Sequence, residues 1–221
     1  GVGEGSPTTV GGGRASWDGR AASDIRVFRE LRFPHSIGLL YSAFTAFLGF
    51  EVNEGEYKVM GMAPYGRPRY MDEVWKLVRL TDQGGFRLEM DYFSYHYSTH
   101  TSFARKFERL FGPPRNPREP FVTAEFAEED GHDSNQLAQS RHYADIAASI
   151  QRVTEELLLV LARQLYEETK LPRLCLAGGV AYNSAANGRI LRETPFTDLY
   201  VQPAAGDSGG AVGAALYVYH V

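Results

Sequence analysis

Apolar residues recur at helical spacing in several stretches of the chain, and the longest of these runs from about Leu137 to Thr169. Within it, apolar side chains recur every three or four residues, which places them on one face of a helix. The pattern therefore predicts a long helix that packs this face against a sheet. Its apolar positions are Ile146, Ile150, Val153, Leu157, Leu161 and Leu165. Shorter patterns predict helices over Ile37–Leu48, Arg69–Leu80 and Phe103–Phe111.

The last quarter of the chain alternates short apolar runs with helical patterns. Strands are expected at Leu174–Ala177 and Leu199–Val201. A helix is expected after each strand, over Ala181–Leu191 and Ser208–Tyr219. This β-α-β-α order is typical of an α/β domain with a partly parallel sheet.

The remaining segments give weaker patterns. Glycines and a proline in Glu51–Gly66 predict no long regular element there, and Gly84–Thr101 is aromatic and β-prone. We expect residues 81–138 to form an inserted or peripheral segment, with its acidic run at Glu125–Asp133 solvated. Near the start of the chain, strands are expected at Thr8–Val10 and Asp24–Leu31.

Composition narrows the class of protein. The 221 residues are 43% hydrophobic and 23% charged, which is an ordinary globular mixture, and the net charge of −4 argues against a general nucleic-acid binder. No apolar run approaches the roughly 20 residues of a membrane span. The single cysteine, Cys175, fits a reducing, cytoplasmic compartment, and its apolar strand predicts a buried thiol. Because the sequence begins with Gly1 rather than Met, we expect a piece of a longer protein.

Two glycine-rich turns follow the two expected strands of the last quarter. The first glycine turn is Ala177–Asn183, and the second glycine turn is Ala205–Gly210. Glycine lets the backbone turn sharply and lets a ligand approach it, and a helix N-terminus offers free N–H groups to an anion. The two turns therefore predict a nucleotide site, with a plain strand-to-helix connection as the alternative.

Individual residues near these turns have two interpretations each. Asn183 is placed to bond a ribose or phosphate oxygen. Asp207 is placed either to cap a helix or to hold a metal that accompanies phosphates. Lys58 is either a phosphate partner or a solvated lysine. Three glycines in the first turns of the last helix cost roughly 0.5–1 kcal/mol each, so close packing or a ligand must account for them. They are Gly209, Gly210 and Gly213.

His96 and His100 have the i, i+4 spacing of a helical metal pair, but their surroundings are irregular and β-prone, so no metal site is expected there. His35, after a proline at a turn, stays ambiguous. No pattern of serine, histidine and aspartate or of a catalytic cysteine is visible.

Five segments match a known family in sequence and in order. Together they resemble the O-carbamoyltransferases of the nodulation-factor, cephalosporin and aminoglycoside type. The least similar region, Val122–Leu137, looks like an insertion. The matching segments are Gly38–Thr45, Gly55–Gly66, Ala144–Gln151, Ala177–Asn183 and Val201–Gly210.

The resemblance implies an actin-like, sugar-kinase-like (ribonuclease H-like) lobe, with a mixed sheet flanked by helices and an irregular insertion. Residues 1–221 would be the second lobe of the actin-like domain. The family's upstream lobe, which carries a histidine metal pair, and its YrdC-like domain would be partners outside this sequence.

The resemblance also implies an activity. Carbamoyl phosphate and ATP give carbamoyl-adenylate, and the carbamoyl group then passes to a hydroxyl of a small-molecule acceptor in natural-product biosynthesis. The family uses a divalent metal, typically Fe²⁺, with Mg²⁺ accompanying ATP. We expect no turnover from this chain alone, and no general base can be named.

Residue by residue, the resemblance places the nucleotide on Gly178, Gly179, Val180, Asn183, Lys58 and Gly206, and the metal on Asp207. Two alternatives remain open. One is a lobe of a tRNA threonylcarbamoyl-transferring enzyme, and the other is a non-catalytic nucleotide-binding lobe.

Overall fold

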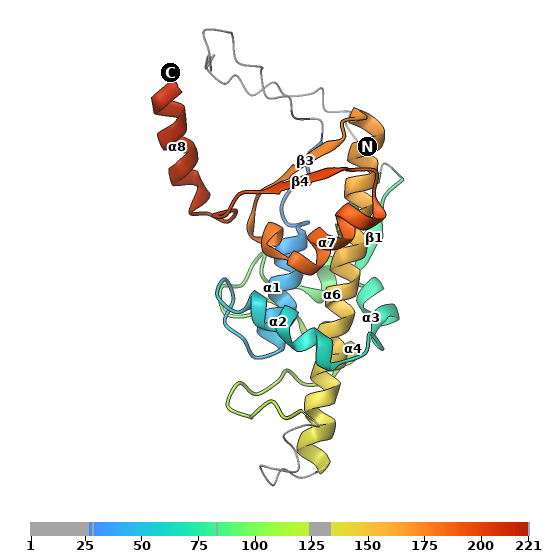
Figure 1. Ribbon diagram of the computed structural model, residues 1–221. Helices are drawn as coiled ribbons and strands as arrows, with labels where there is room; N and C mark the ends of the chain where they lie inside the picture. The colour runs from blue at the N-terminus through green and yellow to red at the C-terminus, as the bar shows by residue number, and fades with distance from the viewer. Residues whose placement is uncertain (1–26, 28, 83, 124–133, 221) are drawn as a thin grey trace.

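A computed structural model of the chain describes residues 27, 29–82, 84–123 and 134–220. The central element is α6 (Ser134–Thr169), a helix of 36 residues that runs through the length of the molecule (Figure 1). The smaller elements pack along it, with β3, β4 and α7 toward its C-terminal end and α1 to α4 along its middle (Figure 1).

The elements before α6 are short, and those after it alternate strand and helix. In chain order they are α1 (Ile37–Phe47), α2 (Glu56–Met62), the 3-10 helix η1 (Ala63–Tyr65), α3 (Met71–Trp75), β1 (Val78–Leu80), β2 (Phe86–Leu88), η2 (Met90–Tyr92) and α4 (Arg105–Phe111). After α6 come β3 (Arg173–Leu176), η3 (Gly179–Tyr182), α7 (Ser184–Glu193), β4 (Asp198–Val201) and α8 (Gly209–His220).

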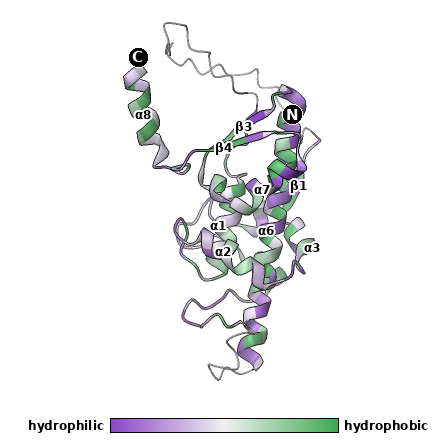
Figure 2. Cartoon of the chain, in the orientation of Figure 1, coloured by the Kyte–Doolittle hydropathy of each residue, from purple (hydrophilic) through white to green (hydrophobic). Residues whose placement is uncertain are grey.

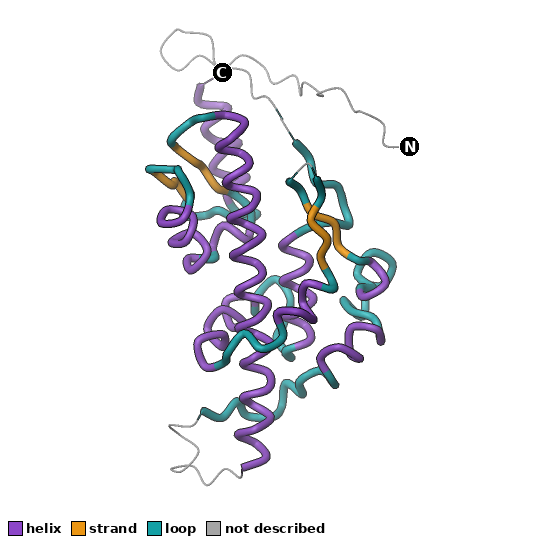
Figure 3. Tube along the Cα trace, turned by 90° about the vertical axis from the view of Figure 1, so that its right-hand side faces the viewer, coloured by secondary structure: helices purple, strands orange, loops and turns teal. Residues whose placement is uncertain are grey.

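The strands form two small sheets rather than one. β1 pairs antiparallel with β2, whereas β3 pairs parallel with β4, in a register that sets Leu174 beside Leu199. The two pairs lie on opposite sides of α6 (Figure 3). The prediction of an α/β chain with a parallel pair in its last quarter is therefore confirmed. The single mixed sheet is not formed within the described residues.

An aromatic cluster forms the main core, between α1, α4 and α6. Phe47 is fully buried, and its ring lies 5.3 Å from that of Phe107 and 5.5 Å from that of Phe103, between centroids. Phe44 meets Phe107 edge-on at 4.9 Å. Tilted and edge-on rings at these distances gain attraction beyond their burial, so the cluster joins the short helices to α6.

A second, smaller cluster fixes the last quarter on the C-terminal half of α6. Leu159 and Ala162 of α6 contact Leu174 of β3 and Ile190 of α7, together with the buried Phe196. These side chains orient the β3–β4 pair and α7, and thereby both glycine turns.

The segment after η1 lies directly on α6, backbone against backbone. A Cβ at Gly66 would lie 2.0 Å from the carbonyl oxygen of Ala144, so only glycine allows this approach. Two side chains of α6 hold the segment: the Arg67 N–H donates to Asp145 Oδ1 at 2.7 Å, and the Tyr70 N–H donates to Ser149 Oγ at 3.0 Å.

Several expected elements are confirmed at close to their predicted bounds. α1 begins after Ser36, whose Oγ caps it by accepting from the Leu39 N–H at 3.3 Å. The helices predicted at Phe103–Phe111 and Ser208–Tyr219 correspond to α4 and α8, and the long helical pattern corresponds to α6.

Other expectations were wrong. The helix predicted over Arg69–Leu80 ends at Trp75, and the chain continues as β1, because Leu77 and Val78 turn into the core. By contrast, the Glu51–Gly66 stretch has no long regular element, as expected: it contains only the seven-residue α2 and the short η1, with Gly61 at an open helical position and Pro64 in the first turn of η1.

Near the start of the chain, residues 27 and 29–31 are not in a strand. The rest of the strand predicted over Asp24–Leu31 lies outside the described residues, as do Thr8–Val10 and the acidic run Glu125–Asp133.

Cys175 is exposed, which corrects the prediction of a buried thiol. Successive residues of a strand face opposite sides, and in β3 the buried position is Leu174. The described residues cover the Leu174 face of this two-stranded sheet, and the cysteine on the other face is exposed.

The last helix, α8, extends away from the rest of the molecule and carries an apolar surface (Figure 2). Val218 is 77% exposed and Tyr219 is 82% exposed, and Leu216 and Tyr217 are exposed as well. None of the helices in the described part of the chain combines the length and apolarity needed to cross a membrane.

We expect Phe47→Ala to lower the free energy of unfolding by about 3–5 kcal/mol, because the substitution opens a cavity at the centre of the aromatic cluster. Urea denaturation followed by circular dichroism measures the change. Tyr97→Ala, at a position 72% exposed, is the matched control and should change stability by less than about 0.5 kcal/mol. Equal effects of the two substitutions would contradict the described core.

Candidate functional site

The first glycine turn connects β3 to α7. Gly178 has φ +96°, a backbone conformation that L side chains rarely adopt, and η3 follows directly. Asn183 then caps α7, since its Oδ1 accepts from the Ala186 N–H at 3.1 Å. The helix predicted from Ala181 thus begins at Ser184, with Asn183 as its cap rather than one turn inside it.

The two glycine turns contact each other. The Gly178 N–H donates to the Ala205 carbonyl oxygen at 2.7 Å, and the Gly206 N–H donates to Tyr182 Oη at 3.1 Å. They meet because β3 and β4 are parallel, so both turns leave the carboxyl ends of neighbouring strands. In open α/β sheets this edge is the usual place for a ligand.

The first turn is open on its outer side. A Cβ at Gly178 or Gly179 would meet no atom within 4 Å, and both residues are exposed. Val180 faces the other way and packs near Gly38 of α1. The turn is therefore anchored on its inner side and accessible on its outer side.

The second turn accounts for only one of the three unexpected glycines. A Cβ at Gly209 would lie 2.3 Å from the Ala204 carbonyl oxygen, so close backbone packing requires glycine there. Gly210 and Gly213 face open space, and nothing in the structure explains them. Gln202 Oε1, beside Gly209, is buried without a hydrogen-bond partner among the described residues.

A buried polar network holds the first turn against α6. The side-chain amides of Asn183 and Gln151 pair reciprocally, with both N–O distances 3.0 Å. Tyr41 Oη donates to Gln151 Oε1 at 2.9 Å, and burial raises the pKa of this phenol, so it remains protonated at neutral pH. Asn183 is thus occupied by structural bonds, and its position is fixed.

The same network continues through charged groups into α7. Gln151 Nε2 donates to Glu155 Oε1 at 2.8 Å, and Arg189 bonds the other oxygen of this carboxylate at 3.0 Å. Arg189 also forms two bonds to Glu193, which raise the pKa of the guanidinium and lower that of the carboxyl. Each buried charge therefore has a partner, as burial requires.

The structure does not bring every predicted residue to the turns. Lys58 Nζ lies 5.9 Å from the Phe50 ring and 5.8 Å from the Tyr57 ring, and no hydrogen bond joins it to either turn. Met60, two residues further along α2, contacts Ser184 near the first turn at 3.9 Å. Two residues of helix rotate by about 200°, so Lys58 faces away from this contact.

The carboxylate of Asp207 is exposed at the second turn. No group of three metal-binding side chains occurs among the described residues, so Asp207 is not part of such a group there. Its role as a metal ligand stays a prediction. His35 has a structural role, because its Nδ1 accepts from the Leu88 N–H at 3.2 Å, which orients β2.

Gln151 and Tyr41 are the residues that sequence patterns alone did not assign to the site. Gln151 is 6% exposed, although the exposed Arg152 follows it directly on α6. Its partners Tyr41 and Asn183 are distant in the sequence, so no local signal marks this position.

Comparisons with known proteins identify the family of the chain. The family model for the carbamoyltransferase N-terminus matches residues 16–216, which include both turns. An uncharacterized protein of Synechocystis is 48% identical over 222 residues, covering 100% of this chain and 32% of that protein. Nodulation protein NolO of Bradyrhizobium diazoefficiens is 35% identical over 185 residues, or 83% of this chain and 28% of NolO.

A more distant similarity covers less of the chain. A tRNA N6-adenosine threonylcarbamoyltransferase of Lactiplantibacillus plantarum is 30% identical over 95 residues, 40% of this chain and 27% of that enzyme. The chain spans about a third or less of the length of the curated relatives it matches. The family model nonetheless extends over most of its residues, and the chain accordingly belongs to the carbamoyltransferase family.

Proposed function

We propose that the chain is the second lobe of an actin-like domain in an ATP-dependent O-carbamoyltransferase. The observation that carries the proposal is the direct contact between two glycine turns at the carboxyl ends of parallel strands. In this proposal, carbamoyl-adenylate, made from carbamoyl phosphate and ATP, transfers its carbamoyl group to a hydroxyl of a small molecule. Natural-product biosynthesis is the proposed setting, because NolO is by name a nodulation protein.

The first glycine turn is the proposed adenylate contact. Its outer face is open at Gly178 and Gly179. Because the Gly178 N–H already donates to Ala205, the Gly179 N–H at the start of η3 is the proposed donor to a phosphate oxygen. Gly206 and Val180 frame the turn from either side. Asn183 acts in this proposal mainly by fixing the turn, since its amide already bonds Gln151 and Ala186.

Unpaired acceptors near the turns are consistent with a ligand that donates hydrogen bonds. Gln202 Oε1 and Asn187 Oδ1 are both buried, and neither has a donor among the described residues. Asn187 also holds η3, because its Nδ2 donates to the Ala181 carbonyl oxygen at 2.7 Å. The hydroxyls of a ribose are donors of the kind that such a site lacks.

The described residues do not by themselves form a metal site, because no three metal-binding side chains gather among them. We propose Asp207 as one ligand of a site completed by other parts of the longer protein. Lys58 faces away from the first glycine turn. Its proposed contact with the nucleotide therefore requires α2 to rotate about its axis.

Two features support the proposal that other parts of the protein, an upstream lobe and a YrdC-like domain, pack against this chain. α8 exposes apolar side chains along its length, and the β3–β4 pair has no further strand at either edge within the described residues. Apolar surface and unpaired strand edges are both normally covered in folded proteins. The relatives are at least three times longer, which leaves room for the covering parts.

A second candidate is a tRNA threonylcarbamoyl-transferring enzyme, favoured by the partial similarity to the Lactiplantibacillus enzyme. The acceptor distinguishes the two functions. Mass spectrometry of the full-length protein with carbamoyl phosphate, ATP and either hydroxylated small molecules or tRNA identifies it. A carbamoylated small molecule supports the proposed function, whereas threonylcarbamoyl-modified tRNA replaces it with the second candidate.

Gly179→Leu should weaken the binding of a non-hydrolysable ATP analogue at least tenfold, because the side chain would fill the open face of the first turn. Gly179 has no neighbouring atom to clash with, so the melting temperature should hardly change. Isothermal titration calorimetry of the full-length protein measures the affinity. Ala138→Leu, which adds a similar exposed side chain near the far end of α6, should bind like the wild type. If Gly179→Leu bound the ATP analogue as tightly as the wild type, the first glycine turn would not be the nucleotide site.

Asp207→Asn should lower the iron content of the purified full-length protein and reduce carbamoyl transfer at least tenfold, because it removes one anionic ligand. Metal analysis by mass spectrometry and a product assay measure the two effects. Asp82→Asn, at another exposed carboxylate, should leave both unchanged. Wild-type iron content in Asp207→Asn would show that this carboxylate is not a metal ligand.

A further inference from the structure

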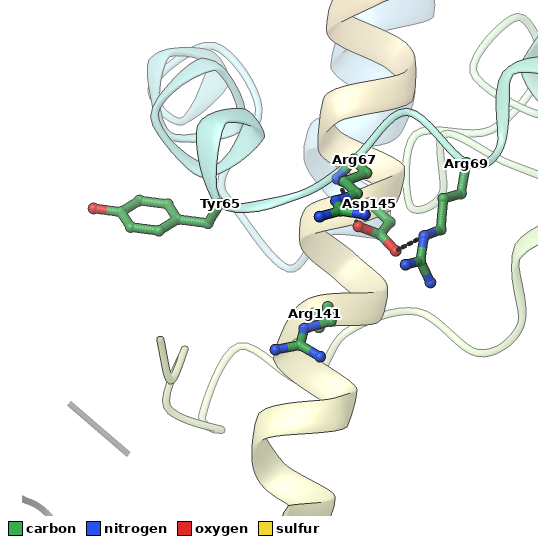
Figure 4. A pocket seen from close by; sticks show the side chains of 5 residues that line it. All are labelled: Tyr65, Arg67, Arg69, Arg141 and Asp145. Carbon is green, nitrogen blue, oxygen red and sulfur yellow. Dashed lines mark hydrogen bonds and ion pairs between the residues drawn. The ribbon is translucent and has the colours of Figure 1, made fainter. Parts of the chain in front are cut away.

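A pocket of about 390 Å³ lies on α6 away from the glycine turns (Figure 4). Arg67 and Arg69 reach it from the segment between η1 and α3, and Arg141 and Asp145 reach it from successive turns of α6. Tyr65 stands at its edge. Tyr65 and Asp145 lie within segments that resemble the family. Neither the roles that the resemblance assigns nor the proposed nucleotide site uses any of these five residues.

The wall of this pocket is held in a defined position. Asp145 is 5% exposed, and its Oδ1 accepts from the Arg67 N–H at 2.7 Å while its Oδ2 lies 3.5 Å from Arg69 Nε. The absence of a side chain at Gly66 lets this segment lie against the α6 backbone. Both carboxylate oxygens of Asp145 therefore hold the segment that carries Arg67 and Arg69.

The pocket carries an excess of positive charge. Three guanidinium groups and one carboxylate give a formal charge of 3 − 1 = +2. Within the described part of the chain, the side chains of Arg67 and Arg141 form no hydrogen bond or ion pair. Figure 4 shows both on the Tyr65 side of Asp145, with Arg69 on the other side. By contrast, Arg152 and Arg189 of this protein each pair with carboxylates.

The pocket is separate from the proposed nucleotide site. Asp145 precedes Gln151, which supports the first glycine turn, by six residues of α6. Six residues correspond to about 9 Å along a helix and roughly a third of a turn around it. A ligand in the arginine pocket would therefore face a different side of α6 from a nucleotide on the turns.

We propose that this pocket binds the phosphate dianion of a small phosphorylated molecule. A charge of +2 matches a dianion, and the planar fork of a guanidinium donates two parallel hydrogen bonds to phosphate oxygens. Tyr65 is 57% exposed, its ring rests edge-on against Phe121 at 5.8 Å, and Figure 4 shows its hydroxyl pointing away from the arginines, so the arginines alone are the proposed phosphate contacts.

Titration of inorganic phosphate and of sulfate into the protein, followed by calorimetry, tests the proposal. Wild type should bind both anions, and R67Q and R141Q should each weaken binding about tenfold, the usual loss for a charged hydrogen bond. R173Q is the matched control, since it removes an equal charge from an exposed position on β3. It should bind phosphate like the wild type. Phosphate should also raise the melting temperature of the wild type and of R173Q, but not of R67Q or R141Q.

Two further arms separate this site from its alternatives. G179L should bind inorganic phosphate normally, so failure of the nucleotide site and failure of the arginine pocket are distinguishable. AMP should compete with inorganic phosphate in G179L if the physiological ligand is a phosphate monoester. No saturable binding of phosphate, or an equal loss in R173Q, overturns the proposal. Tight, salt-sensitive binding of a short RNA by a protein that ignores phosphate and sulfate overturns it as well.

Discussion

Two apolar faces of α6 determine where the elements packed against it lie. Ile146, Ile150, Val153 and Leu157 belong to the main core, and Leu159 belongs to the smaller cluster beneath β3 and α7. Because a helix rises about 1.5 Å per residue, its 36 residues form a rigid axis of roughly 54 Å. The short elements before it and the β-α-β-α ending after it meet mainly through this shared axis.

Polar side chains of α6 then fix the loops that carry chemistry. Asp145 and Ser149 bind the backbone of the segment after Gly66, and Gln151 binds the side chain of Asn183 at the first glycine turn. Each of these groups is buried, and an unpaired partner would cost about 1–3 kcal/mol. The loops are consequently held by specific bonds rather than by apolar contact alone.

The sequence predicted what local patterns encode. The spacing of Ile146, Ile150 and Val153 was enough to place α6, and the glycines at 178 and 179 were enough to place the first turn. Contacts between distant residues have no local signal. Asp145 meets Arg67 across 78 positions, and Gln151 meets Asn183 across 32. That is why the arginine pocket and the support of the first turn emerged only from the structure.

The misjudged elements have physical reasons of the same kind. The pattern of β3 placed Cys175 inside a wider sheet, but β4 is its only neighbour in the described residues, so its second face stays uncovered. Pro64 and the glycines of the α2 region correctly predicted no long element, and the short α2 and η1 tolerate them because Gly61 sits in open space and Pro64 in a first turn. A residue that disfavours a helix in general is tolerated at such positions.

Gly66 gives a simple way to survey related sequences. Any side chain there would collide with the α6 backbone, so a protein with another residue at this position must have moved the whole segment outward. Such a protein would also lose the bond from Asp145 to the Arg67 backbone. A related protein that lacks this glycine is therefore expected to lack the arginine pocket. This holds even where all three arginines are present in its sequence.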